Sequence, residues 1–495
     1  MVDKPNLTFP LAASYNERGI AGFTNTVTNG LDQRKVNSMY ELVKNSVTGK
    51  ATLYLVKRPG TAIANASYGV TGQVAYLVSK GAGLFGGDVA SQWVFSVSGT
   101  DVRASNSGGT TTVILTAAST VPSIVDKTAI SGTDTLVLQT YNTGSGAQRF
   151  WFSSAIATFT EITDGDFTGL SHQGKAEFLD GYMFVLDRTS KAIYNSDLNS
   201  LANWTASNYI TKQIKQDTSI GLIKFGKQIL AFGNESVEGF VNNGNPTGSP
   251  LISAPQLSSN VGLILNQAAY GHYYAQVKDK IYFRGRIGTA TQHSVIAYNG
   301  QTFEKVSTPA IDKILNMNGA YSVDRFSCTG VYGVSFALDP VTATTQRWLV
   351  FFPDWNEWFE WNSTVFCPVG NGIYQLGVGA NQHKIYLISS TADNWQDEGT
   401  DYTWTHQFQL PSDGNQRKFM PYMALKGDTA RSAQSISVQF SDDDGQNWSS
   451  ARTIDMTGTQ KSLFRNGSFR GARQVRLFHA GNTEVRLSQF LAKIE

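Results

Sequence analysis

The side chains that most often bind metals or transfer protons are few and scattered in this sequence. The six histidines stand singly, with no HExxH or HxH spacing: His172, His272, His293, His383, His406 and His479. The two cysteines, Cys328 and Cys367, form no CxxC pair and cannot build a disulfide framework. We therefore expect no catalytic residue, no metal site and no cofactor, although ligands that are distant in sequence can converge in a fold.

Two short motifs resemble reactive sites but lack the residues that the chemistry needs. The glycine-rich stretch GAGLFGG at 81–87 has neither the Lys nor the Ser or Thr of a phosphate-binding loop, so turns explain its glycines better. Ser335, in GVSFA at 333–337, lies in an apolar strand-like run and not in a nucleophile elbow. We expect its hydroxyl to be buried and bonded to the backbone.

The most specific local motif is SDDDGQNW at 441–448, which resembles an Asp-box hairpin with the pattern SxDxGxxW. Ser441 and Asp443 would bond the turn, Gly445 would supply a positive φ and Trp448 would pack beneath it. The motif is common in sialidase-type propellers, so carbohydrate binding or sialidase-like glycan cleavage is an alternative function. Glycoside cleavage needs two carboxylates that flank the sugar, and one structural box does not supply them.

The tryptophans of DWNEWFEW at 354–361 also bear on that alternative. They could form a platform for a sugar ring, but a spacing of three in a hairpin is more typical of packing residues. A third interpretation, a cellular scaffold with a WD-like propeller, lacks the repeat signature.

Basic residues gather near both ends of the chain, and acidic residues are sparse among the last 45. Arginine suits bidentate pairing with carboxylates or phosphates. A solvated strand face, a subunit interface and contact with passing DNA all remain open. The candidate residues for an interface or for proximity to DNA are Arg465, Arg470, Arg473, Arg476, Arg486, Arg34 and Lys35.

Composition limits the class of protein. The 495 residues carry 40 basic and 38 acidic side chains, a formal net charge of +2, so the whole surface is not a trap for polyanions. Hydrophobic residues make up 41%, which excludes wholesale disorder, and charged residues only 16%. No signal peptide and no apolar run of about 18 residues is present, so we expect synthesis in a host cytoplasm and no membrane insertion by this chain.

The elements that must position any site are strands. Runs such as GYMFVLD at 181–187, DKIYFRG at 279–285 and RWLVFFP at 347–353 have the length and composition of strands and end in turns, and most of the runs have bulky residues on alternate positions. They recur in units of about 45 to 55 residues, which suits four-stranded propeller blades, with a pair of β-sandwiches as the alternative. One short helix is expected near 309–315, where Thr308 can cap and Pro309 suits the first position.

The predicted fold class is all-β, a β-propeller joined to a β-rich platform or sandwich domain formed by the N- and C-terminal regions. The predicted domains are 1–50 as an arm and part of the platform, 51–395 as the propeller and 396–495 as the C-terminal platform. A polar, turn-rich stretch at 391–402 marks the second boundary.

Several stretches in fixed order resemble the tail-hub proteins of short-tailed phages (podoviruses), the packaged DNA stabilization proteins. The resemblance covers some 450 positions but weakens in the Gly-, Ser- and Thr-rich region at 60–130. The residues that carry it are Arg34, Asn37, Arg58, Pro59, Gly60, Tyr194, Ser196, Asp197, Leu198, Trp204, Gly221, Phe232, Gly233, Ser236, Glu238, Phe240, Gly244, Pro255, Gly262, Ser307, Thr308, Ile311, Ile314, Asp444, Gly445, Ile494 and Glu495.

This resemblance implies a structural virion protein without catalysis. It implies a hexameric tail hub or nozzle ring below the portal and its adaptor or head-completion protein. The ring would retain packaged DNA, provide the genome-ejection channel and dock tail fibre, spike or needle proteins. Double-stranded DNA would pass through it without sequence specificity, and a near-neutral wall would suit sliding.

Overall fold

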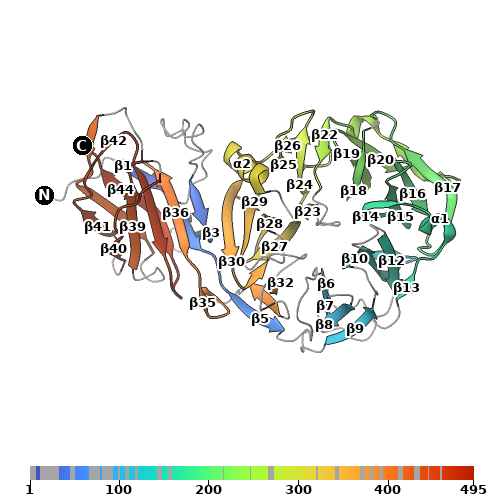
Figure 1. Cartoon of the computed structure of the whole chain (residues 1–495), viewed down its shortest axis with the longest axis horizontal. Helices are drawn as coiled ribbons and strands as arrows, with labels where there is room; N and C mark the ends of the chain where they lie inside the picture. Colours follow the sequence, from blue (N-terminus) through green and yellow to red (C-terminus); the bar gives the residue numbers. More distant parts are fainter. Residues whose placement is uncertain are drawn as a thin grey trace.

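The computed structural model describes most of the chain (Figure 1). The described residues are 7–11, 33–44, 51–65, 78–80, 93–98, 101–105, 111–116, 121–141, 148–153, 159–215, 217–245, 247–265, 273–318, 322–339, 345–367, 374–377, 381, 384–388, 394–410, 416–428, 435–443, 445–456 and 460–495. GAGLFGG, His272 and His383 lie outside these ranges. No helix in the described ranges is both long and apolar enough to cross a bilayer.

Seven sheets of the described chain surround a common centre, which makes this part a β-propeller (Figure 1). The first two are β6 (Val78–Lys80), β7 (Trp93–Ser98), β8 (Asp101–Ser105) and β9 (Thr111–Thr116), then β10 (Val121–Ile130), β11 (Thr133–Tyr141), β12 (Gln148–Ser153) and β13 (Thr160–Glu161). After α1 (Gly165–Thr168) come β14 (His172–Leu179), β15 (Tyr182–Asp187), β16 (Ala192–Ser196) and β17 (Trp204–Thr211), then β18 (Ser219–Phe225), β19 (Gln228–Gly233), β20 (Val237–Asn242) and β21 (Leu251–Ser253).

The fifth and sixth sheets follow a short 3-10 turn, η2 (Pro255–Leu257). They are β22 (Val261–Leu263), β23 (Tyr274–Val277), β24 (Lys280–Ile287), β25 (Ser294–Tyr298) and β26 (Phe303–Lys305), then β27 (Val323–Cys328), β28 (Val331–Ala337), β29 (Gln346–Phe352) and β30 (Glu357–Ser363). Between them lies α2 (Pro309–Asn318), which confirms the predicted helix. The Ile311 amide donates to Thr308 Oγ1 at 3.4 Å, and Ile311 and Leu315 are buried.

The seventh sheet combines strands from distant parts of the sequence. It contains β31 (Phe366–Cys367), β32 (Tyr374–Gly377), β33 (Ile385–Ile388), β5 (Thr61–Asn65), β34 (Gln396–Asp397) and β35 (Thr400–Asp401). Because β5 pairs with β33, an early strand closes the ring against the last ones.

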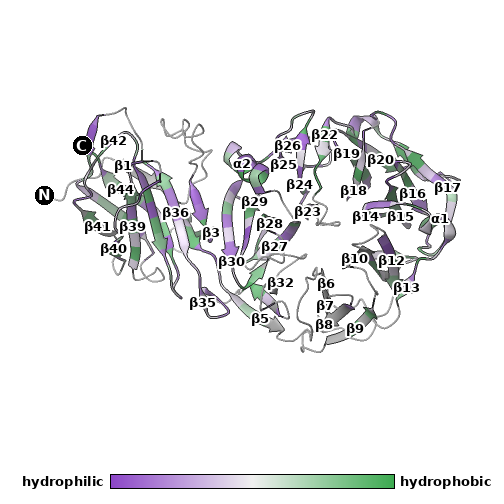
Figure 2. Ribbon diagram, in the orientation of Figure 1, coloured by the Kyte–Doolittle hydropathy of each residue, from purple (hydrophilic) through white to green (hydrophobic). Residues whose placement is uncertain are grey.

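Alternating residues bury one face of many strands. In β30, Glu357, Phe359, Trp361 and Ser363 are buried and the residues between them are partly exposed. Both hydrophilic and less hydrophilic residues lie along this strand (Figure 2). Separate apolar cores form between neighbouring sheets, as where the Phe232 and Phe283 rings meet at 5.0 Å. The sheets pack so closely that a Cβ at Gly262 would lie 1.8 Å from the Asn234 carbonyl oxygen.

The platform contains strands from both ends of the chain. One sheet holds β1 (Leu7–Pro10), β3 (Ser38–Lys44), β4 (Ala51–Lys57), β44 (Arg486–Lys493), β38 (Tyr422–Gly427) and β41 (Gln460–Phe464). The other strands are β36 (Trp404–Gln409), β43 (Gln474–His479), β39 (Ser435–Ser441) and β40 (Arg452–Asp455), with β37 (Arg417–Phe419) and β42 (Ser468–Arg470) as a small pair. Phe408 of β36 contacts Phe490 of β44 within one shared core, so the two sheets form a sandwich.

The all-β fold, with a propeller and a platform, is confirmed. Two details differ from the expected domains. Because β34 pairs with β5, residues 396–401 belong to the seventh propeller sheet and not to a platform that starts at 396. Because β4 pairs with β3 and β44, residues 51–57 belong to the platform sheet and not to a propeller that starts at 51. The hydrophobic Leu55 and Val56 are buried in the platform core, which explains their place.

A short strand joins the two parts. β2 (Arg34–Val36) pairs in parallel with β30 of the propeller and antiparallel with β36 of the platform. The sixth propeller sheet and one platform sheet therefore form one continuous nine-stranded sheet in the order β27-β28-β29-β30-β2-β36-β43-β39-β40.

Candidate functional site

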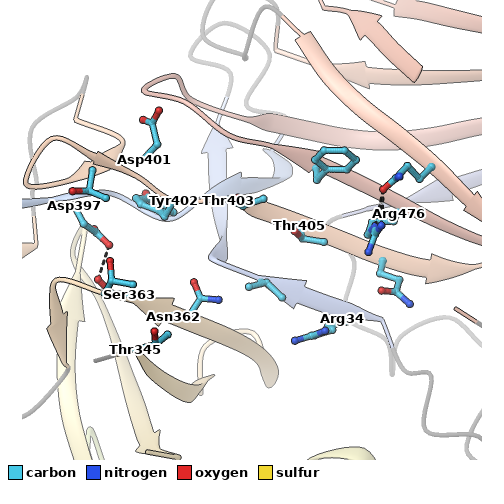
Figure 3. Close-up of a pocket in the computed structure, with 16 residues that line it drawn as sticks. Arg34, Thr345, Asn362, Ser363, Asp397, Asp401, Tyr402, Thr403, Thr405 and Arg476 are labelled. Carbon is cyan, nitrogen blue, oxygen red and sulfur yellow. Dashed lines mark hydrogen bonds between the residues drawn. The ribbon is translucent and has the colours of Figure 1, made fainter. Parts of the chain in front are cut away.

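A groove of about 640 Å³ lies where the propeller meets the platform (Figure 3). Asn362 and Ser363 of β30 and Asp397 of β34 line it on the propeller side. Thr405 and Arg476 line it on the platform side. The lining is rich in arginine, glutamine, threonine and aspartate, so the groove suits polar ligands more than apolar ones.

Four groove residues form a polar row across adjacent strands. Arg34 lies opposite Gln407, Gln407 opposite Arg476, and Arg476 opposite Gln439. Because directly opposed residues project from the same face of a sheet, this row crosses β2, β36, β43 and β39 on one side. We call it the Arg-Gln row.

The two arginines of the Arg-Gln row have different partners. Arg34, 58% exposed at its side chain, forms a bidentate ion pair with Glu360, with contacts of 2.9 and 2.7 Å. Arg476 donates from Nε and Nη2 to Gln439 Oε1 at 3.1 and 2.6 Å, and its guanidinium lies 4.1 Å from the centre of the Trp448 ring. Burial and then the charge of Arg34 lower the pKa of Arg476. Within the described ranges, no carboxylate pairs with Arg476.

A buried polar cluster, the junction cluster, fixes the two parts to each other. Arg58 is 1% exposed and donates from Nη1 and Nη2 to Asp397 at 2.9 and 2.6 Å. Asp397 also accepts a hydrogen bond from Ser363 Oγ at 2.8 Å. The Arg58 guanidinium stacks on Tyr402, 3.8 Å from the ring centre. Burial acts to lower the pKa of Arg58, but the charge of Asp397, the neighbouring Tyr402 and the hydrogen bonds to Asp397 together outweigh burial, and the pKa is raised.

Asn37 completes the junction cluster. It is fully buried, has φ of 52°, and its Oδ1 accepts from the Asn362 amide at 3.0 Å and from Arg58 Nε at 3.1 Å. Its Nδ2 donates to the Thr403 carbonyl at 2.9 Å. One amide side chain thus connects a propeller strand, the platform and the buried arginine.

Gly60 is required by close packing at the same place. A Cβ at this position would lie 2.1 Å from the backbone oxygen of Gln396, a distance that real atoms do not reach. Asn37, Arg58 and Gly60, three of the residues that carried the family resemblance, thus lie together at the junction.

A second buried ion pair connects β2 with β30. Lys35 Nζ contacts Glu357 at 2.5 Å and Tyr40 Oη at 2.9 Å, and both charged side chains are below 10% exposed. Burial acts to lower the pKa of Lys35, while the charges of Glu357 and Tyr40 raise it to a value above the ordinary range.

The Asp-box segment forms a tight turn. Ser441 Oγ donates to Asp443 Oδ1 at 2.7 Å, and Asp443 accepts the Asn447 amide at 2.9 Å. Gly445 has φ of 82°, and Trp448 Nε1 donates to the Gly445 carbonyl at 3.1 Å. The hydrogen bonds from Asn447 and Ser441 lower the pKa of Asp443 to about 2. Trp448 therefore links this turn to Arg476.

The predicted basic residues do not form one basic surface. Lys35, Arg473 and Arg486 are 4%, 4% and 2% exposed. Arg473 pairs with Asp442 at 2.7 Å through both Nε and Nη2, and Arg486 lies 3.0 Å from Glu41 and 3.2 Å from Glu484. Because their charges are buried and compensated, these three cannot serve as solvent-facing DNA contacts. Arg465 and Arg470 are exposed.

The residues considered for chemistry have structural surroundings. Ser335 is 1% exposed and donates to the Asp324 carbonyl at 3.3 Å. Trp358 Nε1 donates to the Val306 carbonyl and Trp361 Nε1 to the Ser38 carbonyl, at 3.1 and 2.7 Å, so both indoles pack inward. Across the described ranges, no group of three His, Cys, Asp or Glu residues is placed to hold a metal ion.

The sequence interpretation missed Asn37, Arg58 and Asp397 as a site. The resemblance had singled out Asn37 and Arg58, but Asp397 lies 339 positions after Arg58 and has no local signal. Arg34 and Arg476, both named as candidates, both line the groove.

Comparison with solved structures finds matches of low similarity. The N-terminal domain of Nup159 is 10% identical, with a TM-score of 0.36, covering 72% of this chain and 98% of that one. BamB from Moraxella catarrhalis is 11% identical, with a TM-score of 0.30, covering 63% and 91%. An exo-beta-1,3-galactanase from Phanerochaete chrysosporium is 9% identical, with a TM-score of 0.26, covering 74% and 95%. TM-scores this low carry no argument about function.

The family comparison is specific. No curated protein matches the chain. Residues 32–336, well over half of the chain, match the family of bacteriophage P22 Gp10, beta-propeller. This range begins just before Arg34 and ends within β28, the second strand of the sixth propeller sheet. The chain belongs to the bacteriophage P22 Gp10 beta-propeller family, and it is a structural phage protein.

Proposed function

We propose that this protein forms the tail hub or nozzle of a short-tailed phage, a hexameric ring below the portal and its adaptor. In this role it retains packaged DNA, provides the channel for ejection and docks tail fibres, spikes or a needle. The observation that carries the proposal is the family match over residues 32–336. The chain acts mechanically and performs no reaction.

The junction supports a mechanical role. A tail component transmits load between neighbours, so its two parts must keep a fixed relation. Here one continuous sheet crosses from propeller to platform, and the buried Arg58, Asp397 and Asn37 bond both sides. Breaking such a buried network costs several kcal/mol, which resists bending at this point.

The platform is the proposed source of the ring contacts, and the propeller points outward or distally toward the appendages. The Arg-Gln row is a suitable contact surface because Arg476 is held in one orientation by Gln439 and Trp448. A guanidinium fixed in this way loses little entropy when it meets a carboxylate of a neighbouring copy. Closed symmetry would repeat that contact around the ring.

Electron microscopy and mass photometry of the purified chain test the proposal, alone and with candidate adaptor rings. We expect a hexameric ring with a central pore. Deleting residues 1–30 should block ring formation, and Arg476→Glu should weaken it while leaving the circular dichroism spectrum unchanged. Arg470→Glu, at an exposed arginine outside the groove, is the matched control. A chain that stays monomeric with every adaptor ring would contradict the proposal, as would an unchanged hexamer after the deletion.

The carbohydrate alternative gains no support from the residues that suggested it, because Trp358 and Trp361 pack inward and the Asp-box bonds its own turn. A glycan array and a fluorogenic sialoside assay separate the two functions. Saturable glycan binding or turnover by the purified chain would favour the alternative.

A further inference from the structure

Arg284, in the middle of β24 in the fifth propeller sheet, carries a buried charge without a carboxylate. It is 6% exposed, and its Nε is buried without a hydrogen-bond partner. The one hydrogen-bond partner of its side chain within the described ranges is His293, whose Nδ1 contacts Arg284 Nη2. Burying a guanidinium is costly unless an opposite charge or several acceptors compensate it. The native fold therefore keeps an uncompensated cation at this position.

Arg286 adds a second donor on the same face of β24. Residues two apart on a strand project to the same side, so Arg284 and Arg286 are neighbours. The Nε of Arg286 is also buried without a hydrogen-bond partner. Within the described ranges, neither arginine forms an ion pair with a carboxylate.

His293 supplies a third donor beside these two. Arginine can only donate hydrogen bonds, so His293 Nδ1 must accept from Arg284 and the ring proton resides on Nε2. The backbone amide of His293 donates to Asn316 Oδ1 at 3.1 Å, and Asn316 Nδ2 donates back to the His293 carbonyl at 3.3 Å. These contacts with α2 hold the histidine in place. Burial, followed by the charges of Arg284 and Arg286, lowers the pKa of His293 to about 4, so the ring is neutral near pH 7 and carries one N–H donor.

We propose that Arg284, Arg286 and His293 form a binding site for a small tetrahedral oxyanion, phosphate or sulfate. The cluster offers N–H donors from two guanidinium groups and one imidazole, which matches an ion that only accepts hydrogen bonds. Because Arg284 is almost fully buried, an ion of a few atoms can reach it more readily than the backbone of a duplex. This site is separate from the groove at the junction and does not depend on the tail-hub role.

Isothermal titration calorimetry and thermal unfolding of the full chain with inorganic phosphate test the site, at constant ionic strength with chloride as the balancing ion. We expect saturable binding and a melting temperature that rises with phosphate concentration. Arg284→Met should weaken binding at least about tenfold, since a charge-assisted hydrogen bond is lost. It should also raise the melting temperature without phosphate, because an unpaired buried charge is removed.

Two further variants keep the test decisive if Arg284→Met does not fold. Arg286→Gln, at a half-buried position, should weaken phosphate binding, and Arg470→Gln, at an exposed arginine in the platform, should leave it unchanged. Binding that persists in both Arg284→Met and Arg286→Gln would overturn the site. So would the absence of saturable binding to the wild type, or binding of a short DNA duplex that needs Arg284 while free phosphate gives no signal.

Discussion

Removing the carboxylate of Asp397 should weaken the attachment of the propeller to the platform more than the loss of a surface ion pair would. Asp397→Ala leaves the guanidinium of Arg58 buried at 1% exposure without its counter-charge and removes the acceptor of Ser363 Oγ. Breaking a buried pair by removing one partner costs about 3–5 kcal/mol. We expect this loss in the free energy of unfolding, a large share of the roughly 5–15 kcal/mol that holds a typical domain.

Chemical denaturation followed by tryptophan fluorescence measures that loss, and hydrogen exchange locates it at β2, β34 and β36. The matched control is Glu304→Ala, which breaks the surface ion pair between Glu304 and Lys280. The side chains of Lys280 and Glu304 are 31% and 47% exposed, respectively. Such a pair is worth about 0–1 kcal/mol. The double variant Arg58→Met with Asp397→Leu should recover most of the stability, since no charge remains buried. If Asp397→Ala costs no more than Glu304→Ala, the junction cluster is not what holds the two parts together.

Three further predictions concern other buried positions. Burial and then the charge of Lys35 lower the pKa of fully buried His406 to about 3, below the unfolded value of about 6.5. Because the unfolded chain binds the proton at a higher pH than the folded chain does, the free energy of unfolding should fall by about 2 kcal/mol between pH 7 and pH 5. Urea titrations at the two pH values measure this difference, and His406→Phe should remove it. Gly60→Ala should destabilise by about 1–3 kcal/mol in thermal unfolding because the new methyl meets backbone, whereas Gly165→Ala, with open space around its Cβ, should be near neutral. Glu238→Gln should destabilise by about 1–3 kcal/mol in the same assay, since the carboxylate accepts two backbone amides and Ser253 Oγ, and an unchanged midpoint would refute this account.

The sequence was sufficient for the features that local patterns encode. Thr308 and Pro309 predicted the start of α2, and the short apolar run RWLVFFP, which ends in a turn, predicted β29. These succeed because a cap or a short apolar strand depends on neighbours within a few positions.

The junction and the fates of the arginines could not be predicted in the same way. Lys35 pairs with Glu357 at a separation of 322 positions, and Arg58 with Asp397 at 339. The local sequence does not distinguish a basic residue that is exposed to solvent, as Arg470 is, from one that is buried against a distant carboxylate. The cross-strand register that brings Arg34 and Arg476 into one row likewise depends on strands from opposite ends of the chain.

The pairing of β5 with β33 has a consequence for biosynthesis. The strand that completes the seventh sheet leaves the ribosome early, but its partner follows roughly 320 residues later, a delay of roughly 15 to 65 seconds at about 5–20 residues per second. Until then the nascent chain exposes an unpaired edge at each end of an open arc. Truncated translation products that lack β33 therefore cannot close the ring of sheets. We expect host chaperones or proteases to intercept them before they reach an assembling particle.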